Sequence, residues 1–398
     1  MGAVPERFVG LRCPACGEAV EASFDTSHCP ACATLLEPQL DLDVIELTRH
    51  TLEHTAMDSM WRYDELLPID AADAISVGEG GTPLLACPEL ARDLGVGDLW
   101  IKFEGSNPTG TFKDRGQSLA LSAATKVQAE TVALASAGNA GHAAAAYGAR
   151  AGVDVRVFLP ARSGFTQKAM VNVHGADLTV VQGRLPDAGA AFREAIDAHP
   201  DWVSVATDDT PFRREGKKTM FFEIAEQLDW RSPDAIVYPT GGGVGLLGMA
   251  KGVHELSELG WIESTPRFFA AQSTGCSPVV DAFEAGSADI HPVEQPDTIC
   301  GGIEVPDPTA GSLILDVLRS SDGGAVATDD DAILDAALSV AETEGIAMAP
   351  TAGVTVSATA SLVEAGQLGV DDEVVLVATG TGLKEADILR SQLMSKGV

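Results

Sequence analysis

The sequence predicts an α/β protein with mainly parallel sheets, preceded by a small metal-binding ribbon. Two observations lead to this fold class. From residue 76 onward the chain alternates short apolar, β-rich runs with alanine-rich stretches of helical composition. Ahead of them, two CxxC motifs lie within residues 1–45. A length of 398 residues allows two or three domains and a large buried core.

Seven segments are predicted to be β-strands. Most of them are nearly continuous apolar runs, as expected for strands that helices cover on both faces. The stretches between most of them have helical patterns, which favours parallel pairing through helical crossovers. The predicted strands are residues 99–104, 131–135, 153–159, 178–181, 235–238, 267–271 and 373–378.

The charge of the chain limits the classes of partner. Asp and Glu number 58 against 26 Lys and Arg, so the formal net charge is −32. Such a surface repels phosphate backbones, so we do not expect a nucleic-acid partner. Only nine of the basic residues are lysines. An acidic surface with little lysine is what we expect of a halophile-like protein working in high salt; an ordinary acidic protein is the alternative.

The sequence gives no sign of a membrane or secreted protein. No run of about 18 apolar residues occurs, and the first residues lack the basic and apolar regions of a signal peptide. Seven cysteines, an odd number, argue against a disulfide framework. We therefore expect a cytoplasmic protein without membrane partners.

Residues 1–45 are predicted to form a zinc ribbon. Cys13 and Cys16 belong to one CPAC motif, and Cys29 and Cys32 belong to a second one, with twelve residues between the two motifs. Four thiolates at this spacing suit a tetrahedral, structural zinc ion with no position open for substrate. So short a segment has too little core to fold without metal. The alternatives are reduced thiols that never meet, or His28 as a competing ligand.

Residues 46–75 are predicted to be a polar helix and a linker, and residues 76–398 a catalytic body. Within this body, the segment Asn107–Gly116 follows a predicted strand and opens a helix, and it contains Lys113. The dipole at a helix start disfavours the charged ammonium and so supports a nucleophilic amine. A surface lysine in a loop is the alternative interpretation.

Three further strand ends are rich in glycine or hydroxyl groups. The turn at residues 136–141 offers the Ser136 hydroxyl and backbone amides to a carboxylate, unless its glycines serve only close packing. Residues 240–245 hold four glycines, which suits an anion cradle of backbone N–H groups. Thr379 follows the last strand, at the edge where open α/β sheets bind ligands.

This combination resembles the fold-type II pyridoxal-phosphate enzymes over residues 76–398. Four segments look most like those of the threonine synthases within that family, some of which also carry a zinc ribbon. The segments are GEGGTPLL (78–85), NPTGTFKDRG (107–116), EGKKTMFFEIAEQL (215–228) and TGTGLK (379–384). The resemblance implies a two-lobed body, with a smaller lobe of about residues 118–215 inserted in the larger one, the cofactor between them, and a homodimer.

The resemblance also implies residue roles. Lys113 would bind the cofactor covalently and, once freed, remove the α-proton of the substrate. Asn139 would hydrogen-bond the cofactor's 3′-oxygen, and Thr379 would face its pyridine nitrogen. The substrate carboxylate would rest on Ser136, Ala137 and Gly138. The cofactor phosphate would be cradled by Gly241, Gly242, Gly243, Val244 and Gly245.

For the reaction, the resemblance implies a lyase of threonine biosynthesis that converts O-phosphohomoserine and water to threonine and phosphate by γ-elimination and β-addition. A phosphorylated substrate needs a second anion site, for which Arg115 and Lys217 are the leading candidates. The wider set of cations is Arg115, Arg162, Lys168, Arg213, Arg214, Lys217 and Lys218. A solvated helix face is the alternative for residues 213–218.

Two positions depart from the threonine synthase pattern: Ala349 precedes Pro350, and the glycine segment reads GGGVG. Two alternatives therefore stay open. One is a serine/threonine dehydratase or another enzyme of β-elimination or β-replacement, which needs no second phosphate site. The other is a non-catalytic, ribbon-bearing interaction protein.

Overall fold

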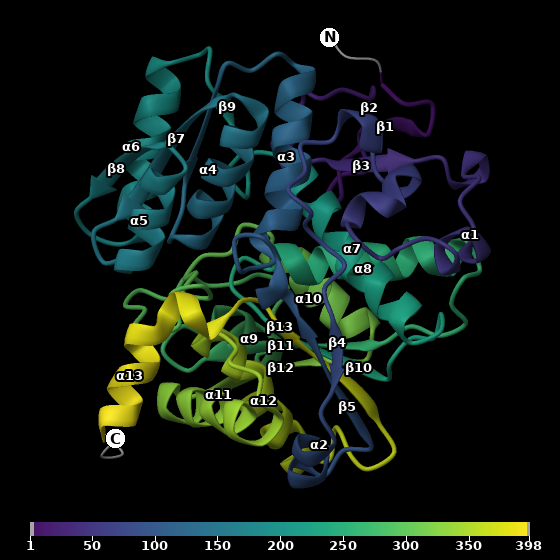
Figure 1. Ribbon diagram of the computed structural model, residues 1–398, viewed down its shortest axis with the longest axis vertical. Coiled ribbons are helices and arrows are strands. Elements are labelled where there is room, and N and C mark those ends of the chain that lie inside the picture. Colours follow the sequence, from purple (N-terminus) through teal and green to yellow (C-terminus); the bar gives the residue numbers. More distant parts are fainter. Residues whose placement is uncertain (1–3, 396–398) are drawn as a thin grey trace. The chain divides into compact units, whose positions relative to one another are not determined.

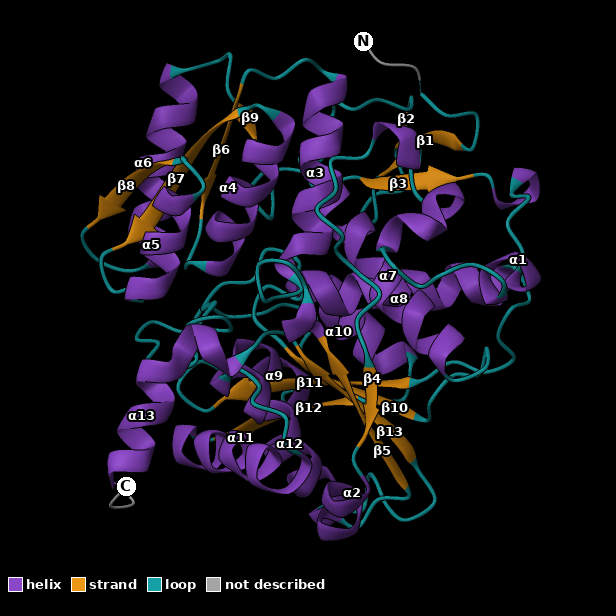
Figure 2. Cartoon of the chain, viewed as in Figure 1, coloured by secondary structure: helices purple, strands orange, loops and turns teal. Residues whose placement is uncertain are grey.

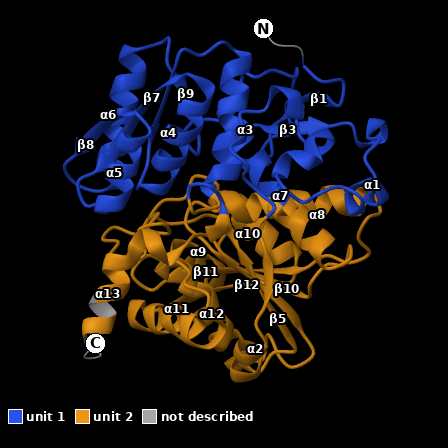
Figure 3. Cartoon of the chain, viewed as in Figure 1, with its two compact units in different colours: residues 1–81, 107–109, 113–219 blue, residues 82–106, 110–112, 220–398 orange. Residues whose placement is uncertain are grey.

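The computed structural model describes residues 4–395, and the chain divides into two compact units (Figure 3). Unit 1 comprises residues 1–81, 107–109 and 113–219, and unit 2 comprises residues 82–106, 110–112 and 220–398. Each unit has its own sheet and its own buried core. Within the described residues, no helix combines the length and apolar composition needed to cross a bilayer.

Unit 1 begins with a three-stranded antiparallel sheet in the order β2-β1-β3 (Figure 1). Only short helices follow before the first long one, so the helix predicted within residues 46–75 is split into single turns. The strands are β1 (Phe8–Arg12), β2 (Ala19–Val20) and β3 (Glu37–Leu40). The short helices are η1 (Leu42–Val44), α1 (Arg49–Glu53), η2 (Met60–Leu66) and η3 (Ala71–Asp73).

The rest of unit 1 is a four-stranded parallel sheet in the order β8-β7-β6-β9 (Figure 2). Its strands are β6 (Thr131–Ala135), β7 (Asp154–Pro160), β8 (Asp177–Val181) and β9 (Val203–Ser204). Apolar side chains such as Val132, Leu134 and Val157 are fully buried under helices. The helices are α3 (Lys113–Lys126), α4 (Asn139–Ala151), α5 (Phe165–Val173), α6 (Leu185–Ala198) and α7 (Phe212–Gln227), which runs on into unit 2.

Unit 2 contains a six-stranded sheet in the order β12-β11-β10-β13-β5-β4, parallel except for β4. All five residues of β10 are buried, which explains its continuous apolar sequence. The strands are β4 (Leu84–Ala86), β5 (Asp98–Phe103), β10 (Ala235–Pro239), β11 (Arg267–Ser273), β12 (Gly324–Thr328) and β13 (Glu373–Ala378).

Helices connect the strands of unit 2, and α12 packs against β10, β12 and β13. The longer ones are α8 (Val244–Glu258), α10 (Gly311–Ser320), α11 (Asp330–Glu344), α12 (Pro350–Glu364) and α13 (Ala386–Ser395). The shorter ones are α2 (Pro88–Leu94), η4 (Glu104–Ser106), α9 (Pro278–Glu284) and η5 (Gly382–Glu385).

The predicted fold class, α/β with mainly parallel sheets, is confirmed. Each of the seven predicted strands is present, shifted at its ends by two residues or fewer. The sequence patterns missed β4, β9, β12 and the ribbon strands. These strands are short or built from small residues, so they form through pairing with a neighbour rather than through strong apolar patterns of their own.

Candidate active site

Three chain segments leave the sheet of unit 2 at one edge. Strand β13 pairs in parallel with β10 on one side and with β5 on the other. The carboxyl ends of neighbouring parallel strands lie at the same edge of a sheet, where open α/β folds bind ligands. Here that edge carries the glycine loop 240–243 after β10, Thr379 after β13 and residues 104–112 after β5.

The glycine loop combines packed and open positions. A Cβ added at Gly243, whose φ is +72°, would overlap the Ile314 side chain. One added at Gly245 would overlap the Tyr238 hydroxyl, and one at Gly241 would lie 3.0 Å from the Ile303 Cα. At Gly242, in contrast, an added Cβ would meet nothing within 4 Å. The loop is therefore packed tightly at Gly241, Gly243 and Gly245, whereas Gly242 borders open space.

The loop leads into the N-terminus of α8. Gly243 caps this helix, and a glycine has no side chain that could bond the first N–H groups of the helix. Helix N-termini attract anions because these N–H groups and the helix dipole point outward. Behind the loop, the Thr240 carbonyl accepts a hydrogen bond of 2.9 Å from Gln272 Nε2. The result is a rigid, uncharged cradle for an anion.

Thr379 is almost fully buried and lies beside the segment that leads to Lys113. The Phe112 N–H donates to the Thr379 carbonyl at 3.0 Å, and Thr111 forms a β-bridge with Gly380. Lys113 is the next residue after Phe112, so the backbone of the candidate lysine is covalently tied to this strand edge.

Lys113 is the first residue of α3 in unit 1, where two glycines let α3 and α7 cross closely. A Cβ at Gly216 would overlap the Arg115 carbonyl, and one at Gly116 would lie 2.9 Å from the Arg213 carbonyl. This crossing brings the basic start of α7 against the start of α3. Each glycine therefore has a packing role that its motif alone does not reveal.

The crossing creates a buried cluster of cations. Arg213 and Lys217 are fully buried, and Lys113 is partly buried. Burial, and then the Arg213 guanidinium, lower the pKa of Lys113 to about 7. Burial, and then Arg213 and Lys113, hold the pKa of Lys217 well below its usual range. Such a group of like charges in a poorly solvated place favours an anionic ligand.

Arg213 has donors to offer such a ligand. Its Nη1 donates to the Val205 carbonyl at 3.2 Å. Its Nε and Nη2 are buried, and neither has a hydrogen-bond partner among the described residues. A guanidinium fixed at one nitrogen and open at two others suits bidentate binding of a phosphate.

The other predicted cations are used differently. Arg115 is fully buried and donates from Nη1 to Thr219 Oγ1 at 3.0 Å. Lys218 forms an ion pair of 2.6 Å with Glu215, both fully buried, and Arg214 pairs with Glu37. Arg162 is exposed, and Lys168 Nζ donates to the Ala161 carbonyl at 2.5 Å. Residues 213–218 are thus a largely buried basic segment and not a solvated helix face.

The loop between β6 and α4 is shaped by Ser136. Its Oγ accepts hydrogen bonds of 3.0 Å from the N–H groups of Gly138 and Gly141. Gly138 has φ +147°, and a Cβ there would lie 2.6 Å from Gln167 Cγ. Next to it, Asn139 opens α4, and its buried Oδ1 has no hydrogen-bond partner in the described part of the chain. An acceptor held in this way is suited to a ligand hydroxyl.

Two further polar groups near these loops escaped the sequence patterns. The Tyr238 hydroxyl lies beside Gly245, and burial followed by the Glu104 carboxylate holds its pKa well above the usual range. Gln167 lies beside Gly138, with its Oε1 buried and without a partner among the described residues. Tyr238 sits inside an apolar strand and Gln167 inside a helix, so neither stands out in the sequence.

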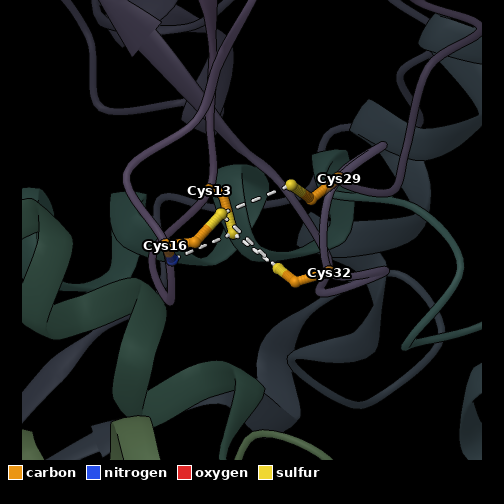
Figure 4. A group of neighbouring side chains, drawn as sticks. All are labelled: Cys13, Cys16, Cys29 and Cys32. Carbon is orange, nitrogen blue, oxygen red and sulfur yellow. Dashed lines mark hydrogen bonds between the residues drawn. The ribbon is translucent and has the colours of Figure 1, made fainter.

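The four cysteines of the ribbon converge at one point (Figure 4). Their Sγ atoms lie within 4.8 Å of one another, at 3.4 Å for Cys13–Cys32 and 3.6 Å for both Cys16–Cys29 and Cys16–Cys32. A tetrahedral zinc ion with Zn–S bonds of ~2.3 Å requires Sγ separations of ~3.8 Å. The sulfur atoms are thus close to the arrangement that one zinc ion needs.

The two CxxC turns have the same backbone geometry. The Cys13 N–H donates to the Glu18 carbonyl, and the Gly17 N–H donates back to the Cys13 carbonyl. The second turn repeats both bonds. The Cys29 N–H donates to the Thr34 carbonyl, and the Ala33 N–H donates to the Cys29 carbonyl. This internal repeat explains why two short CPAC motifs present their thiols in matching orientations.

Comparison with known proteins agrees with this geometry. Residues 75–380 match the model of the family described as pyridoxal-phosphate dependent enzyme. A threonine synthase of Methanosarcina acetivorans is 37% identical over 83% of this chain and 81% of that protein. A threonine synthase of Methanocaldococcus jannaschii is 36% identical over 82% of this chain and 81% of that protein.

Solved structures share the fold at low sequence identity. Diaminopropionate ammonia lyase from Escherichia coli superposes with a TM-score of 0.70 at 17% identity, over 81% of this chain and 90% of that one. Maize serine racemase superposes with a TM-score of 0.67 at 21% identity, over 79% of this chain and 92% of that one. Given a family match over most of its length, the chain belongs to the pyridoxal-phosphate dependent enzymes.

Proposed function

We propose that the chain is a threonine synthase, which converts O-phosphohomoserine and water into threonine and phosphate. The relatives named threonine synthase cover more than four-fifths of the chain at 36–37% identity. The observation within the structure that supports this substrate is the buried cation cluster of Lys113, Arg213 and Lys217. A substrate phosphate would pair with the Arg213 guanidinium and favour the protonated forms of the two amines, and an unphosphorylated side chain would not.

The residues present fit pyridoxal phosphate. The buried Oδ1 of Asn139 offers an acceptor to the 3′-hydroxyl of the cofactor. The glycine loop 241–245 offers N–H groups, with open space at Gly242, to its phosphate. Lys113, with its pKa lowered to about 7, provides an amine that is about half neutral at pH 7 and able to bind the aldehyde in that form. When bound, the cofactor supplies an electron sink for the carbanion formed at the substrate's α-carbon.

The reaction then follows from what the protein groups hold and move. The Ser136–Asn139 loop binds the substrate carboxylate through its N–H groups. Lys113 accepts the α-proton because burial and Arg213 lower its pKa to about 7, so that about half of the amine is neutral at pH 7. Arg213 and Lys217 bind the phosphate, which leaves from the γ-carbon with the bonding electron pair after a β-proton is removed. One proton is returned to the γ-carbon, which becomes the methyl group, and a second is returned to the α-carbon after water has added. Water then adds at the β-carbon, which completes threonine.

A serine/threonine dehydratase is the second candidate, because a fungal L-serine ammonia-lyase shares the fold with a TM-score of 0.68 at 23% identity. That reaction needs β-elimination alone and no second phosphate site. The buried, partly unpartnered guanidinium of Arg213 favours the synthase. We propose Arg213 together with Lys217, rather than Arg115, as the main phosphate ligands, because Arg115 Nη1 is already bonded to Thr219.

The decisive test is an assay of the purified enzyme and of Arg213→Met. We expect phosphate release from O-phosphohomoserine, and a kcat/KM at least about 30-fold lower in the variant, since a lost buried charge contact costs ~2 kcal/mol or more. Arg162→Met, at an exposed arginine, is the matched control and should match the wild type. Production of 2-oxobutanoate from threonine without activity on the phosphorylated substrate would identify the dehydratase instead.

We also propose that Cys13, Cys16, Cys29 and Cys32 bind one structural zinc ion. The Sγ separations and the repeated turn geometry support this site. Four thiolates leave no position open for a substrate, so the ion would stabilise the ribbon fold and take no part in the reaction.

The ribbon has a structural connection with the start of α7 inside unit 1. The Phe212 ring lies 5.5 Å from the Phe24 ring and 6.4 Å from the Phe8 ring, measured between centroids. Glu37 pairs with Arg214, and His28 Nε2 bonds to the Asp208 carbonyl at 3.0 Å. We propose that the zinc-bound ribbon fixes the backbone around Arg213 and so supports the phosphate site.

The remaining expectations stay predictions. They are a homodimer, a cytoplasmic enzyme without a nucleic-acid partner, a high-salt working environment and a smaller lobe at about residues 118–215. The net charge of −32 supports the expectations about nucleic acid and salt.

A further inference from the structure

We propose that His50, Glu53 and His54 form a second metal site, which takes one divalent transition-metal ion independently of the cysteines. The candidate ligand atoms of His50, Glu53 and His54 all lie within 4.8 Å of one another. Within the described residues, the cysteine cluster is the other group of three or more His, Cys, Asp or Glu residues with this property. Neither the proposed synthase reaction nor the ribbon uses these three residues.

The spacing of the residues on α1 brings the ligands together. His50 and His54 are four residues apart, and Glu53 is three residues after His50, so all three project from one side of a helical turn. The two imidazole rings lie 4.2 Å apart between centroids. All three side chains are exposed, so an ion can reach them without any opening of the fold.

The hydrogen bonding of His54 already suits a metal ligand. Its Nδ1 lies 2.8 Å from the His50 carbonyl, which can only accept, so Nδ1 is the protonated nitrogen of the neutral ring. The other nitrogen, Nε2, then carries the lone pair that a metal ion binds. Protein zinc sites commonly use this arrangement, in which a backbone carbonyl fixes the tautomer and direction of the ligand ring.

The short helix is held rigidly enough to preorganise these ligands. Thr48 caps its start by accepting a hydrogen bond of 3.1 Å from the Thr51 N–H. Leu52, on the opposite side, is buried with 1% of its surface exposed. Arg62 donates to the Leu52 and Thr55 carbonyls and so closes the end of the turn. The backbone is thus fixed at both ends, and only side-chain rotations are needed to close around an ion.

The donor set identifies the class of ion. Two imidazole nitrogens and one carboxylate oxygen suit Zn²⁺, Cu²⁺ or Ni²⁺ better than Mg²⁺ or Ca²⁺, which prefer oxygen ligands. Three protein ligands leave at least one position for water, so the ion is exchangeable, unlike one held by four thiolates. The strongly acidic chain raises the local concentration of cations around this exposed site.

The test compares zinc uptake by full-length proteins. Zn²⁺ is titrated into the wild type and into the double variant His50→Asn/His54→Asn, and binding is measured by calorimetry and metal analysis. We expect the wild type to bind one more ion per chain than the double variant. Glu53→Gln should retain the extra ion with lower affinity. Removal of either imidazole alone should lower the affinity for this ion at least about tenfold, because even a change in the groups around a metal ligand costs that much.

A matched control is available on α8, where His254 and Glu258 also stand four residues apart, 3.5 Å between Nε2 and Oε1, without a second histidine. His254→Asn should bind as many ions as the wild type. NMR signals of the His50 and His54 rings should shift on addition of Zn²⁺ to the wild type. Equal uptake by the wild type and the double variant, or unshifted ring signals, would overturn the site whether or not the cysteines bind zinc.

Discussion

The two units carry opposite kinds of chemistry. Unit 1 supplies charge: after burial, the Arg213 guanidinium is the largest cause of the lowered pKa of both Lys113 and Lys217. Unit 2 supplies backbone: the glycine loop and Thr379 carry no charged side chain, and their donors are fixed N–H groups. The site residues of unit 1 are therefore shaped by repulsion between like charges, and those of unit 2 by close packing around the glycine loop.

This difference suggests a division of tasks. A preorganised cradle of neutral donors suits a group that stays bound through every turnover, such as the cofactor phosphate. Crowded cations suit a group that arrives and leaves with each turnover, because their mutual repulsion is relieved only while the anion is present. Substitutions in unit 1 should therefore alter proton transfer and substrate use, and those in unit 2 should alter stability and cofactor retention.

The largest effect is expected for Lys113→Ala. We proposed that this amine binds the cofactor aldehyde and accepts the α-proton, so activity should fall by several orders of magnitude in the variant. Borohydride reduction followed by mass spectrometry should find the cofactor on Lys113 in the wild type and no covalent adduct in the variant. Lys126→Ala, at the other end of α3, is the control and should keep the adduct.

The next largest effect concerns the ribbon. Cys29→Ser removes one of four thiolates, and a structural zinc ion contributes about 10–16 kcal/mol to such small modules. The variant should bind less zinc and melt at a lower temperature, with a raised KM for O-phosphohomoserine if the ribbon supports Arg213. Cys276→Ser, at a buried cysteine outside the cluster, should keep its zinc. Unchanged zinc content in Cys29→Ser would rule out the four-thiolate site.

Two glycine substitutions separate steric strain from ligand contact in unit 2. Gly245→Ala overlaps the Tyr238 hydroxyl and should destabilise the apoenzyme by about 1–3 kcal/mol. Gly242→Ala meets no protein atom within 4 Å, so the melting temperature should hold while cofactor affinity falls. Calorimetric melting and cofactor titration measure both quantities. Equal melting temperatures for the two variants would contradict the packing of the loop.

The sequence alone was sufficient for features encoded in local patterns. The edges of β6 and β13 agree with their apolar runs residue for residue, and the strand-to-helix position of Lys113 is as predicted. Paired CxxC motifs predicted the convergence of the cysteines, because each turn positions its own two thiols. These features depend on neighbours a few residues away.

Features that depend on distant contacts could not be predicted. Gly116 and Gly216 are one hundred residues apart, and their close approach is what buries Arg213 beside Lys113. From the sequence, residues 213–218 fit a solvated helix face as well as a ligand site. The open donors of Arg213 and the position of the Tyr238 hydroxyl beside Gly245 depend on the packing of the folded chain.

The smallest expected effect is a shift in a pH profile. The pKa of Lys113 is lowered to about 7 by burial and then by Arg213, so the amine is largely neutral above that pH. Arg213→Met removes the second cause and raises this pKa toward the ordinary value of about 10.5. At pH 7 the neutral fraction falls, and the rate at which the apoenzyme binds pyridoxal phosphate covalently should fall with it. The midpoint of the rate profile should move to higher pH.

The lowered pKa of Lys113 also makes folding stability depend on pH, which provides a second measurement. Between about pH 7 and the pKa of an unfolded lysine, the unfolded chain binds more protons at residue 113 than the folded one. Folding stability of the apoenzyme should therefore rise with pH across this window, and less steeply in Arg213→Met. Arg162→Met should leave both profiles unchanged. Superimposable profiles for Arg213→Met and wild type would show that Arg213 does not lower the pKa of Lys113. The proposed electrostatic difference between the two units would then be wrong.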